Sequence, residues 1–551
     1  MSLGSSRGAW WGLWLVLLAA VGLLGSAPSS PESEAAQAAP LGESCQKCHA
    51  SIVESYRKTR MARSSGPATE DFKPADFVHA SSGVHYRITR EGEKVWLSFD
   101  RDGNDPLHGK RELRYYIGSG VRGRTYVFQV DGFYFEAPIN WYGDRKQWDM
   151  TPAYQKVGEA PLNLPLQQSC TFCHLSGYPA PEKGTESKYG RLNPVHAGID
   201  CERCHGDSNA HLRGGKIVNP AKLDAAKRDS VCMQCHMEAT AAIDLPGKSQ
   251  YEYRPGMDIS EVVRYYTLEG GTERLGAVSQ VQAMAESGCK RGAGERMSCT
   301  SCHDPHSSPT AAERVQYFRN KCLACHGAEF GAKHHQEQPD CTSCHMPKSA
   351  SSDVAHTQVT DHRIPRYRVA IANASTSAEP KLQPFLHTKA AQADVRSLAL
   401  AWASLAQRGM KYAGPVADRL LNEQSKRTPN DIAVVSALAW SEQTHGHSEA
   451  AEGLYKRALQ LDPTELDAAA SLGQLQVERG EVREGVRRWM DVFERAPERT
   501  EVAINISRAF CAAGLQKEAQ QVAERALDFN PDSHDGKLTQ RKVAKDPPEC
   551  R

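Results

Sequence analysis

The motif Cys-x-x-Cys-His occurs seven times between Cys45 and His345. Its two thiols and the adjacent imidazole are the groups that attach c-type haem, because the cysteines bond to the porphyrin and the histidine binds the iron. Zinc sites also use Cys-x-x-Cys, but they have no need of a histidine directly after the second cysteine. The pattern therefore predicts seven covalently bound c-type haems.

These haems would use fourteen of the seventeen cysteines. The cysteines predicted to bind the cofactor are Cys45, Cys48, Cys170, Cys173, Cys201, Cys204, Cys232, Cys235, Cys299, Cys302, Cys322, Cys325, Cys341 and Cys344. The predicted proximal iron ligands are the motif histidines His49, His174, His205, His236, His303, His326 and His345.

The first residues are typical of an export signal. Arg7 is the only charged residue before an apolar run from Ala9 to Gly25, and small residues ending at Ala27 form a cleavage site. We expect a signal peptide over residues 1–27 and a periplasmic or cell-surface location, where covalent haem attachment takes place. The alternative is an uncleaved membrane anchor, because the run is near the lower length limit for a span. Residues 28–40 are rich in Ser, Ala, Glu and Pro, which predicts a disordered leader.

The formal net charge of +1 underestimates the acidity expected of the complete protein. Each haem brings two propionates, so many Lys and Arg side chains are expected to neutralise them. The sequence has no sustained basic run, and we expect no nucleic-acid partner.

All the haem motifs lie within residues 41–370, which we interpret as a heptahaem cytochrome c domain. Residues 77–149 contain no cysteine and alternate in the manner of strands, with a hairpin turn at Asp131-Gly132. This pattern predicts a small antiparallel β insertion. Long periodic segments are few elsewhere in the domain, so we expect the porphyrins to form much of its core.

A prolyl residue recurs every 34 residues in the C-terminal part, at Pro429, Pro463, Pro497 and Pro531. That period is typical of tetratricopeptide repeats, in which each repeat is a pair of helices. We predict a repeat domain over residues 385–551, with clear repeats at 430–463, 464–497 and 498–531. An unrelated helical bundle is the alternative. Residues 371–384 are expected to be a linker, so that the repeats fold independently. The predicted fold class is mainly α, with a haem-packed domain followed by an α-solenoid.

Several segments resemble exported multihaem cytochromes c of the cytochrome c-554 type fused to C-terminal tetratricopeptide repeats. The resemblance covers nearly the whole mature chain and fixes fold and cofactor better than role. Its members are usually presumed to be electron carriers. It is carried by Cys45-Gln-Lys-Cys-His with Tyr56 and Thr59-Arg-Met-Ala-Arg, Ile117-Gly-Ser-Gly, Gly198-Ile-Asp-Cys-Glu-Arg-Cys-His-Gly, Cys299-Thr-Ser-Cys-His-Asp-Pro-His, Cys344-His-Met-Pro-Lys and His356-Thr-Gln-Val-Thr-Asp-His-Arg-Ile-Pro.

A haem used only for electron transfer normally has a second strong ligand opposite the proximal histidine. Position and the family pattern give the candidate distal ligands His79, His211, His306, His334, His335, His356 and His362. His306 is too close in sequence to His303 to serve the same haem, so it would serve a neighbour. No ligand role is expected for His85, His108, His196, His387, His445, His447 and His534.

Met61 is a further distal candidate, opposite His49. Relatives of the cytochrome c-554 type commonly have histidine at about this place, and a thioether ligand would raise the potential of the haem. The alternative is a packed core methionine.

Three roles are possible for Cys289, which lies outside the motifs. It is a candidate thiolate ligand, a disulfide partner of Cys511 or Cys550, or a buried residue. Cys511 is most simply a core residue of a repeat helix, and Cys550 is expected to be free.

We expect an electron-transfer protein whose repeat domain, or an exposed haem edge, docks a redox partner. One alternative is a reductase or oxidase of a small nitrogen or sulfur compound, which needs one iron with an open coordination site. All seven motifs end in histidine, which argues against the ammonia-forming nitrite reductases that use Cys-x-x-Cys-Lys. The other alternative is a scaffold subunit of a respiratory complex.

Overall fold

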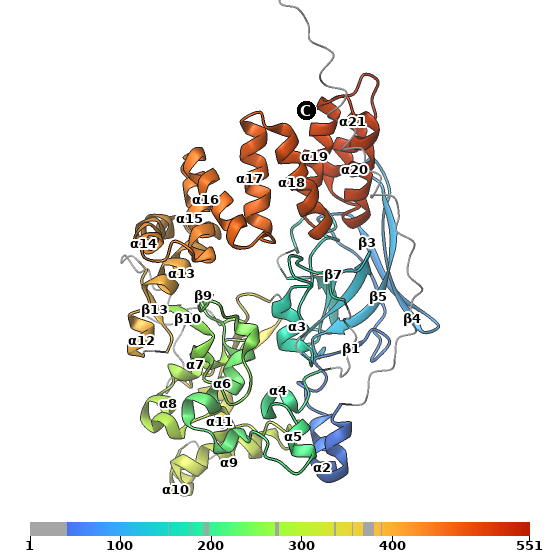
Figure 1. The fold of residues 1–551 in the computed structure, drawn as a ribbon. Coiled ribbons are helices and arrows are strands. Elements are labelled where there is room, and N and C mark those ends of the chain that lie inside the picture. The colour runs from blue at the N-terminus through green and yellow to red at the C-terminus, as the bar shows by residue number, and fades with distance from the viewer. Residues whose placement is uncertain are drawn as a thin grey trace, which may run out of the picture.

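The computed structural model describes residues 41–550 except 153, 178, 191, 193–197, 270–274, 335–337, 355, 367–379 and 387. The expected signal peptide and leader, His196, His335, His387 and most of the expected linker lie outside the described residues. Three parts follow one another along the chain: an antiparallel sheet, a region of short helices that carries most of the haem motifs, and a series of C-terminal helices (Figure 1).

The segment expected to contain strands forms an eight-stranded antiparallel sheet, which is larger than a small insertion. Its inward side chains alternate along β4, where Val95, Leu97 and Phe99 are fully buried. Asp131 and Gly132 both have positive φ, as a tight hairpin turn requires. The strands are β1 (Ser65–Pro67), β2 (Ala75–Val78), β3 (His85–Glu91), β4 (Lys94–Arg101), β5 (Leu107–Ile117), β6 (Gly123–Val130), β7 (Phe133–Tyr142) and β8 (Gln147–Met150).

The haem motifs lie on short helices before and after this sheet. Two small antiparallel sheets accompany them: β9 (Ala241–Asp244), β10 (Val263–Leu268) and β13 (Leu382–Pro384) form one, and β11 (Lys348–Ala350) with β12 (Gln358–Thr360) form the other. Because β13 pairs with β10, the end of the expected linker belongs to a sheet of the preceding domain. Among the described residues, no helix combines the length and apolar character needed to cross a membrane.

The C-terminal helices pack as successive antiparallel pairs. Their pairing is close: a Cβ added at Gly473 would lie 2.8 Å from the ring of Trp489, so glycine is needed where α17 meets α18. The prolines at positions 463 and 497 follow the second helix of a pair, which they cannot continue. The helices are α13 (Val395–Gln407), α14 (Gly414–Arg427), α15 (Ile432–Thr444), α16 (Ser448–Leu461), α17 (Leu466–Glu478), α18 (Val482–Arg495), α19 (Thr500–Ala512), α20 (Gln516–Phe529) and α21 (His534–Val543).

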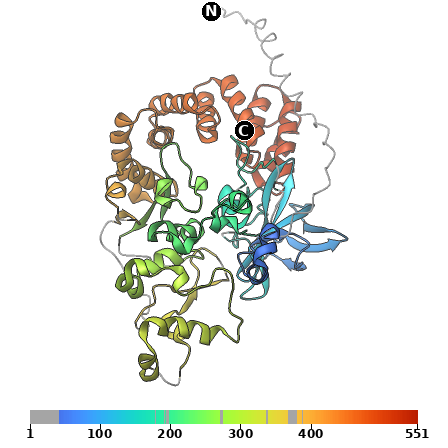
Figure 2. The ribbon, with the colours of Figure 1, turned by 60° about the horizontal axis from the view of Figure 1, so that its bottom comes forward.

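The helical pairs curve into an arc whose two ends meet the rest of the molecule (Figure 2). At the N-terminal end, the guanidinium of Arg396 donates to the carbonyl of Asp244 (2.8 Å), and that of Arg408 donates to the carbonyl of Thr240 (2.6 Å). Both carbonyls lie on or beside β9. The first repeat helix is therefore bound to the small sheet that contains β13.

At the C-terminal end, the arc completes the core of the large sheet. Phe529 is 1% exposed and lies among the residues of that core. Its ring is 6.1 Å from the rings of both Phe133 and Phe135. A fragment of the C-terminal helices without the sheet would expose this side chain, and whether such a fragment folds independently stays a prediction.

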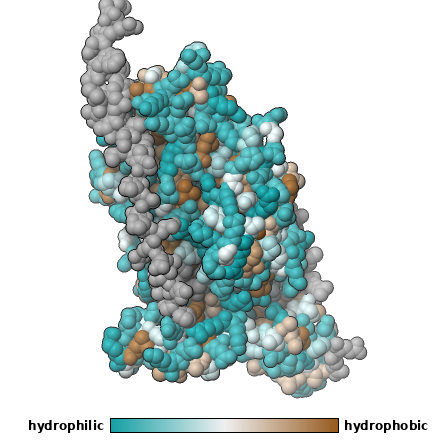
Figure 3. Space-filling model, turned by 90° about the vertical axis from the view of Figure 1, so that its right-hand side faces the viewer, coloured by the Kyte–Doolittle hydropathy of each residue, from teal (hydrophilic) through white to brown (hydrophobic). Residues whose placement is uncertain are grey.

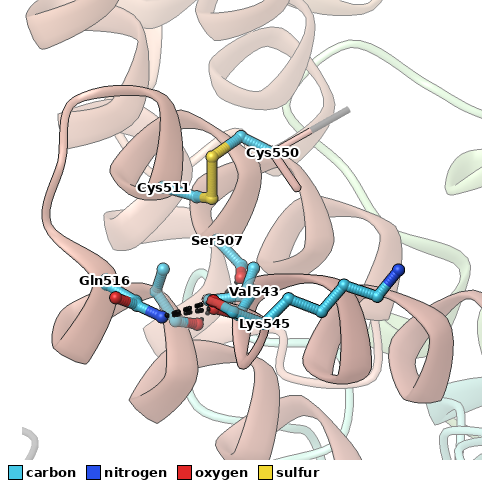
Figure 4. Close-up of a disulfide and its surroundings, with 7 residues drawn as sticks. Ser507, Cys511, Gln516, Val543, Lys545 and Cys550 are labelled. Carbon is cyan, nitrogen blue, oxygen red and sulfur yellow. Dashed lines mark hydrogen bonds between the residues drawn. A yellow bond between two sulfur atoms is a disulfide. The ribbon is translucent and has the colours of Figure 1, made fainter. Parts of the chain in front are cut away.

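A disulfide joins Cys511, on α19, to Cys550 near the C-terminus (Figure 4). Cys511 is a buried core residue of its helix, as expected, at 3% exposed, but its thiol is bonded. The expectation of a free thiol at 550 is wrong, and neither residue is available as a partner for Cys289. Gln516 also holds this tail, because its amide donates to the carbonyls of Val543 (2.8 Å) and Lys545 (3.1 Å). The C-terminal segment is therefore fixed to the last repeat.

The face shown in Figure 3 is largely hydrophilic, with hydrophobic residues scattered among polar ones. Three of the exposed large hydrophobic residues, Ile52, Leu212 and Phe330, lie close in sequence to motif histidines or their partners.

Candidate haem-binding sites

Most motif helices end at the motif histidine itself. Within a helix, positions i, i+3 and i+4 share one face, so the two thiols and the imidazole of a motif project to the same side. The helices that end in this way are α3 (Gln168–His174), α4 (Glu202–His205), α6 (Ala225–His236), α9 (Arg314–His326) and α11 (Cys341–His345). In α2 (Glu43–Tyr56), the helical geometry breaks at His49.

Four motif histidines face the ring of a histidine from elsewhere in the chain. The ring centroids of His49 and His211 are 6.4 Å apart with an interplanar angle of 18°. The other three pairs are His205 with His306 (5.9 Å, 11°), His303 with His362 (6.3 Å, 32°) and His345 with His334 (5.9 Å, 30°).

These separations fit two imidazoles on opposite sides of one iron. Metal–nitrogen bonds of about 2 Å, added to the distance from each nitrogen to its ring centre, give roughly 6 Å between centroids. Direct ring stacking would bring them closer. The residues present therefore fit an iron ion between the two rings of each pair.

Backbone carbonyls orient several of these rings. Nδ1 of His205 donates to the carbonyl of Val218 (2.9 Å), and Nδ1 of His211 donates to that of Gly215 (3.1 Å). His345 donates in the same way to Pro365 (3.0 Å) and His362 to Thr360 (2.9 Å). Donation from Nδ1 leaves Nε2 free for a metal, as in most histidine-ligated sites.

Burial keeps several of these imidazoles in the neutral form that binds iron. It lowers the pKa of His174 to about 4 and that of His303 to about 4. The pKa values of His306 and His362 are also lowered, again mainly by burial. At neutral pH these rings therefore carry a lone pair for a metal.

Exposed apolar side chains, which are unfavourable in water, lie close to residues of two of the histidine pairs. Ile52 is 43% exposed and Leu212 54% exposed, and they lie near His49 and His211 in sequence. Phe330, 49% exposed, lies with its ring centroid 5.3 Å from that of His326 and 4.9 Å from that of His334. A porphyrin is the kind of large apolar surface that would cover such side chains.

The motifs also lie close to one another. Arg203, inside the third motif, is 1% exposed, and its guanidinium lies 4.2 Å from the ring centroid of Phe172 in the second motif. Its Nη2 is 3.8 Å from Sγ of Cys235 in the fourth motif. The amide of Gln234 donates to the carbonyl of Arg203 (3.1 Å). Three motifs therefore meet around one arginine.

Thiols that belong to different motifs also lie close to one another. The thiol of Cys299 in the fifth motif holds the pKa of Cys232 in the fourth motif well above its usual range. Burial and the thiol of Cys341 in the seventh motif raise the pKa of Cys322 in the sixth to about 11. Burial also raises the pKa of Cys302, helped by the nearby thiol of Cys289. Cys289 itself forms no disulfide in the structure.

Three predicted distal ligands are placed differently from expectation. Both ring nitrogens of His79 are occupied, by Ser82 Oγ (2.8 Å) and the carbonyl of Gln155 (3.0 Å), so the ring has no nitrogen left for iron. Nε2 of His356 is 2.5 Å from Asp149 Oδ2, so it also faces a carboxylate. His211, rather than Met61, faces His49.

Within the described part of the chain, no ring contact joins His174, His236 or His326 to a second histidine, and the ring of His326 lies against Phe330. The predicted candidate His335 lies outside it. Sequence reasoning also missed the carbonyls that orient the rings. Backbone acceptors leave no pattern of side chains in a sequence. The one sequence signal for such a turn is the pair Gly214-Gly215 after Arg213.

Two family models match parts of the chain. One, described as "Cytochrome c554 and c-prime", matches residues 144–206, which contain the second and third motifs. The other, a doubled CXXCH motif, matches residues 292–331, which contain the fifth and sixth. Both matches support a multihaem cytochrome c with covalently bound c-type haem.

One curated relative is a "Multiheme cytochrome MtrA" from Shewanella baltica (strain OS185), 26% identical over 220 residues. The match covers 35% of this chain and 65% of that protein's length. Solved structures similar to part of the chain include MamA (15% identity, TM-score 0.23, 25% of this chain and 80% of that one). Another is a tetratricopeptide repeat protein from Parabacteroides merdae (16% identity, TM-score 0.24, 27% and 58%).

Proposed function

We propose that this protein is an exported electron carrier that holds seven covalently bound c-type haems. The observation that carries the proposal is the set of four imidazole pairs, each formed by a motif histidine and a histidine outside the motifs, with ring centroids 5.9–6.4 Å apart. When bound, haem would supply a one-electron couple at iron. The porphyrins would also supply the apolar core that the short motif helices lack.

The protein's own residues favour electron transfer over catalysis at these four sites. Two imidazoles would occupy both axial positions, so a substrate would find no open position there. The contacts around Arg203 and between the thiols of successive motifs support a continuous series of sites. The series would run from the first motif on α2 to the seventh on α11, which lie at separate places in Figure 1.

The number of haems tests the proposal directly. The mature protein, made in a host with haem-attachment machinery, should show seven haems per chain by pyridine haemochrome assay and by intact mass. Replacing Cys201 and Cys204 by Ser should remove one haem. Replacing the non-motif Cys289 by Ser should remove none. A stoichiometry clearly below seven in fully matured protein would contradict the proposal.

Export and partner docking complete the proposed role. The apolar segment that ends at Ala27 would direct the chain to the periplasm or cell surface. A redox partner would dock on the repeat arc or at an exposed haem edge. Cross-linking of the reduced protein in a periplasmic extract, followed by mass spectrometry, tests this. Cross-links restricted to residues 65–150 would place the partner on the sheet instead.

A second function is favoured at the sixth motif. The ring of His326 lies against Phe330, a side chain that cannot bind iron. An open position there would allow reduction or oxidation of a small nitrogen or sulfur compound. The oxidised protein would then show a high-spin electron paramagnetic resonance signal that cyanide converts to low-spin. That signal should disappear when Cys322 and Cys325 are replaced by Ser, because this haem is then not attached.

A further inference from the structure

The large sheet holds a hairpin of the haem region at two points. The hairpin is β11–β12, and the backbone N–H of Gln358 on β12 donates to Oδ2 of Asp144 (3.2 Å), in the turn between β7 and β8. Just before β12, Nε2 of His356 donates to Oδ2 of Asp149 on β8 (2.5 Å). The ring of His356 also lies edge-on to that of Tyr142, with centroids 4.9 Å apart.

The residues that follow β12 serve two candidate haem sites. His362 donates from Nδ1 to the carbonyl of Thr360, the last residue of β12, and its ring faces that of His303. Three residues later, the carbonyl of Pro365 accepts from Nδ1 of His345 (3.0 Å). One short segment therefore sets the distal imidazole of the fifth site and the orientation of the proximal imidazole of the seventh.

The backbone of this segment is held in an unfavourable conformation. His356 has φ +56° and Ile364 has φ +51°, in the left-handed region. A β-branched residue such as isoleucine is rarely found there. Such conformations persist only where surrounding contacts hold them. At His356, the hydrogen bond to Asp149 and the ring contact with Tyr142 hold the backbone in this conformation.

These contacts are few. A cavity of about 420 Å³ lies between the sheet and the hairpin, lined by Asp144, Arg145, Ala350, Ser351, Val354, His356, Thr357 and Gln358. Because this space is open and partly polar, the two elements are joined here by individual hydrogen bonds. Asp144 is itself held by Arg122, whose Nη1 is 3.7 Å from Oδ2 of Asp144. Loss of one carboxylate should therefore loosen the hairpin without opening an apolar core.

We propose that Asp149 and Asp144 of the large sheet are positioning residues that, through the β11–β12 hairpin, hold His362 at the fifth haem and His345 at the seventh. The inference rests on the proposed haems at these sites. The sheet contains no haem motif, and the proposal gives it the role of positioning two iron ligands. It also gives His356 a role other than iron ligation, as the residue through which Asp149 acts.

The test uses the full-length holoprotein and compares Asp149→Ala and His356→Phe with Asp102→Ala. Asp102 lies at the end of the same sheet and its side chain is 98% exposed, so it is a matched control. His356→Phe removes the hydrogen bond from the hairpin side but keeps an aromatic ring next to Tyr142. Haem content is measured first, and electron paramagnetic resonance of the oxidised protein is recorded second.

We expect both test variants to keep seven haems and to convert part of one low-spin signal to high-spin. It should be the same signal that His362→Ala converts completely. Asp149→Glu, which keeps a carboxylate, should retain most of the low-spin signal, and Asp102→Ala all of it. If Asp149→Ala accumulates poorly, His356→Phe alone decides the outcome.

The two ways of failing are distinguishable. If His362→Ala leaves every low-spin signal unchanged, the proposed haem ligation at this site is wrong. If His362→Ala has its effect while His356→Phe leaves all signals low-spin, the ligation holds and the positioning role is overturned. Conversion of a different low-spin signal in His356→Phe would also overturn it, because His356 would then be an iron ligand itself.

Discussion

Arg101 on strand β4 donates to Asp532, which follows the last repeat, over an N–O distance of 2.5 Å, and the carboxylate is fully buried. Lys537 pairs with the same carboxylate at 2.9 Å, and the backbone N–H of Ala160 donates to it at 2.6 Å. Residues more than 400 positions apart thus share one buried ionic cluster. It joins the C-terminal end of the repeat arc to the sheet.

Asp532→Ala should strongly destabilise this joint. The substitution would leave Arg101 and Lys537, which have little solvent, with the half-exposed Asp105 as the carboxylate that they still share. Breaking a buried pair costs about 3–5 kcal/mol, and Asp105 should offset part of that loss. Urea denaturation followed by far-ultraviolet circular dichroism measures the loss. Asp528→Ala is the control, since that side chain is 61% exposed and should change the free energy of unfolding little.

Phe529→Ala should loosen the arc from the sheet without removing a charge. Loss of a buried aromatic ring costs about 3–5 kcal/mol because it leaves a cavity. Limited proteolysis should then release a repeat fragment sooner than it does from the wild-type protein. Val482→Ala, at a 40% exposed position on α18, should not accelerate cleavage. Equal cleavage rates for Phe529→Ala and wild type would show that contacts other than this ring hold the joint.

The disulfide between Cys511 and Cys550 should stabilise the last repeat. It closes a loop with a sequence separation of 39, for which chain entropy predicts a contribution of about 4 kcal/mol. Cys550→Ser should therefore lower the midpoint of urea unfolding, measured on protein that has all its haems. Cys289→Ser is the matched control. An unchanged midpoint in Cys550→Ser would mean that the bond is absent from the mature protein.

Stability should fall as the pH rises because of Glu498, which is 5% exposed at the contact between the repeats and Glu186. Burial, with some repulsion from Glu186, raises the pKa of Glu498 from 4.5 to about 8. The folded state then binds more protons than the unfolded state between these values. The stabilisation that proton binding by Glu498 gives the folded state is complete below pH 4.5 and is lost as the pH rises through about 8.

Glu498→Gln should flatten this part of the stability-versus-pH curve, measured by urea unfolding from pH 5 to 9. Glu501→Gln, an exposed change on α19, the helix that begins just after Glu498, should leave the slope as it is. The idea fails if the Glu498→Gln curve keeps the wild-type slope.

The first haem should be ligated by His211 and not by Met61. His211→Ala should convert one low-spin electron paramagnetic resonance signal to high-spin, because it removes the imidazole that faces His49. Met61→Ala should leave the visible spectrum and every resolved potential unchanged. A loss of absorbance near 695 nm in Met61→Ala, the expected mark of sulfur ligation at roughly that wavelength, would reverse this assignment.

The local chemistry of the sites could be predicted from the sequence, because each motif is a contiguous pattern. The four ring pairs include four of the predicted distal candidates, yet their pairing was not predictable. His306 lies three residues from His303 but faces His205, a relationship set by tertiary packing. His79 looked like a free ligand, and only the fold shows that Ser82 and the carbonyl of Gln155 occupy its two nitrogens.

The sheet and the helical pairs could also be predicted from patterns within single segments. Strand alternation and the 34-residue proline period are local repeats, and they indicated the sheet and the helical pairs. The joint between them was not predictable, because Phe529 looks like any core residue of a repeat helix. Its partners Phe133 and Phe135 are almost 400 residues away, and a pattern within one segment carries no information about such a contact.

The place of Phe529 in the sheet core also constrains the order of events during biosynthesis. Residues 65–150 leave the ribosome first, but their core is complete only when a residue from near the end of the chain has been delivered. All seven Cys-x-x-Cys-His motifs precede that residue. Every pair of thiols is therefore synthesised before the last side chain of the sheet core is available, and haem attachment can proceed on a chain that has not yet closed.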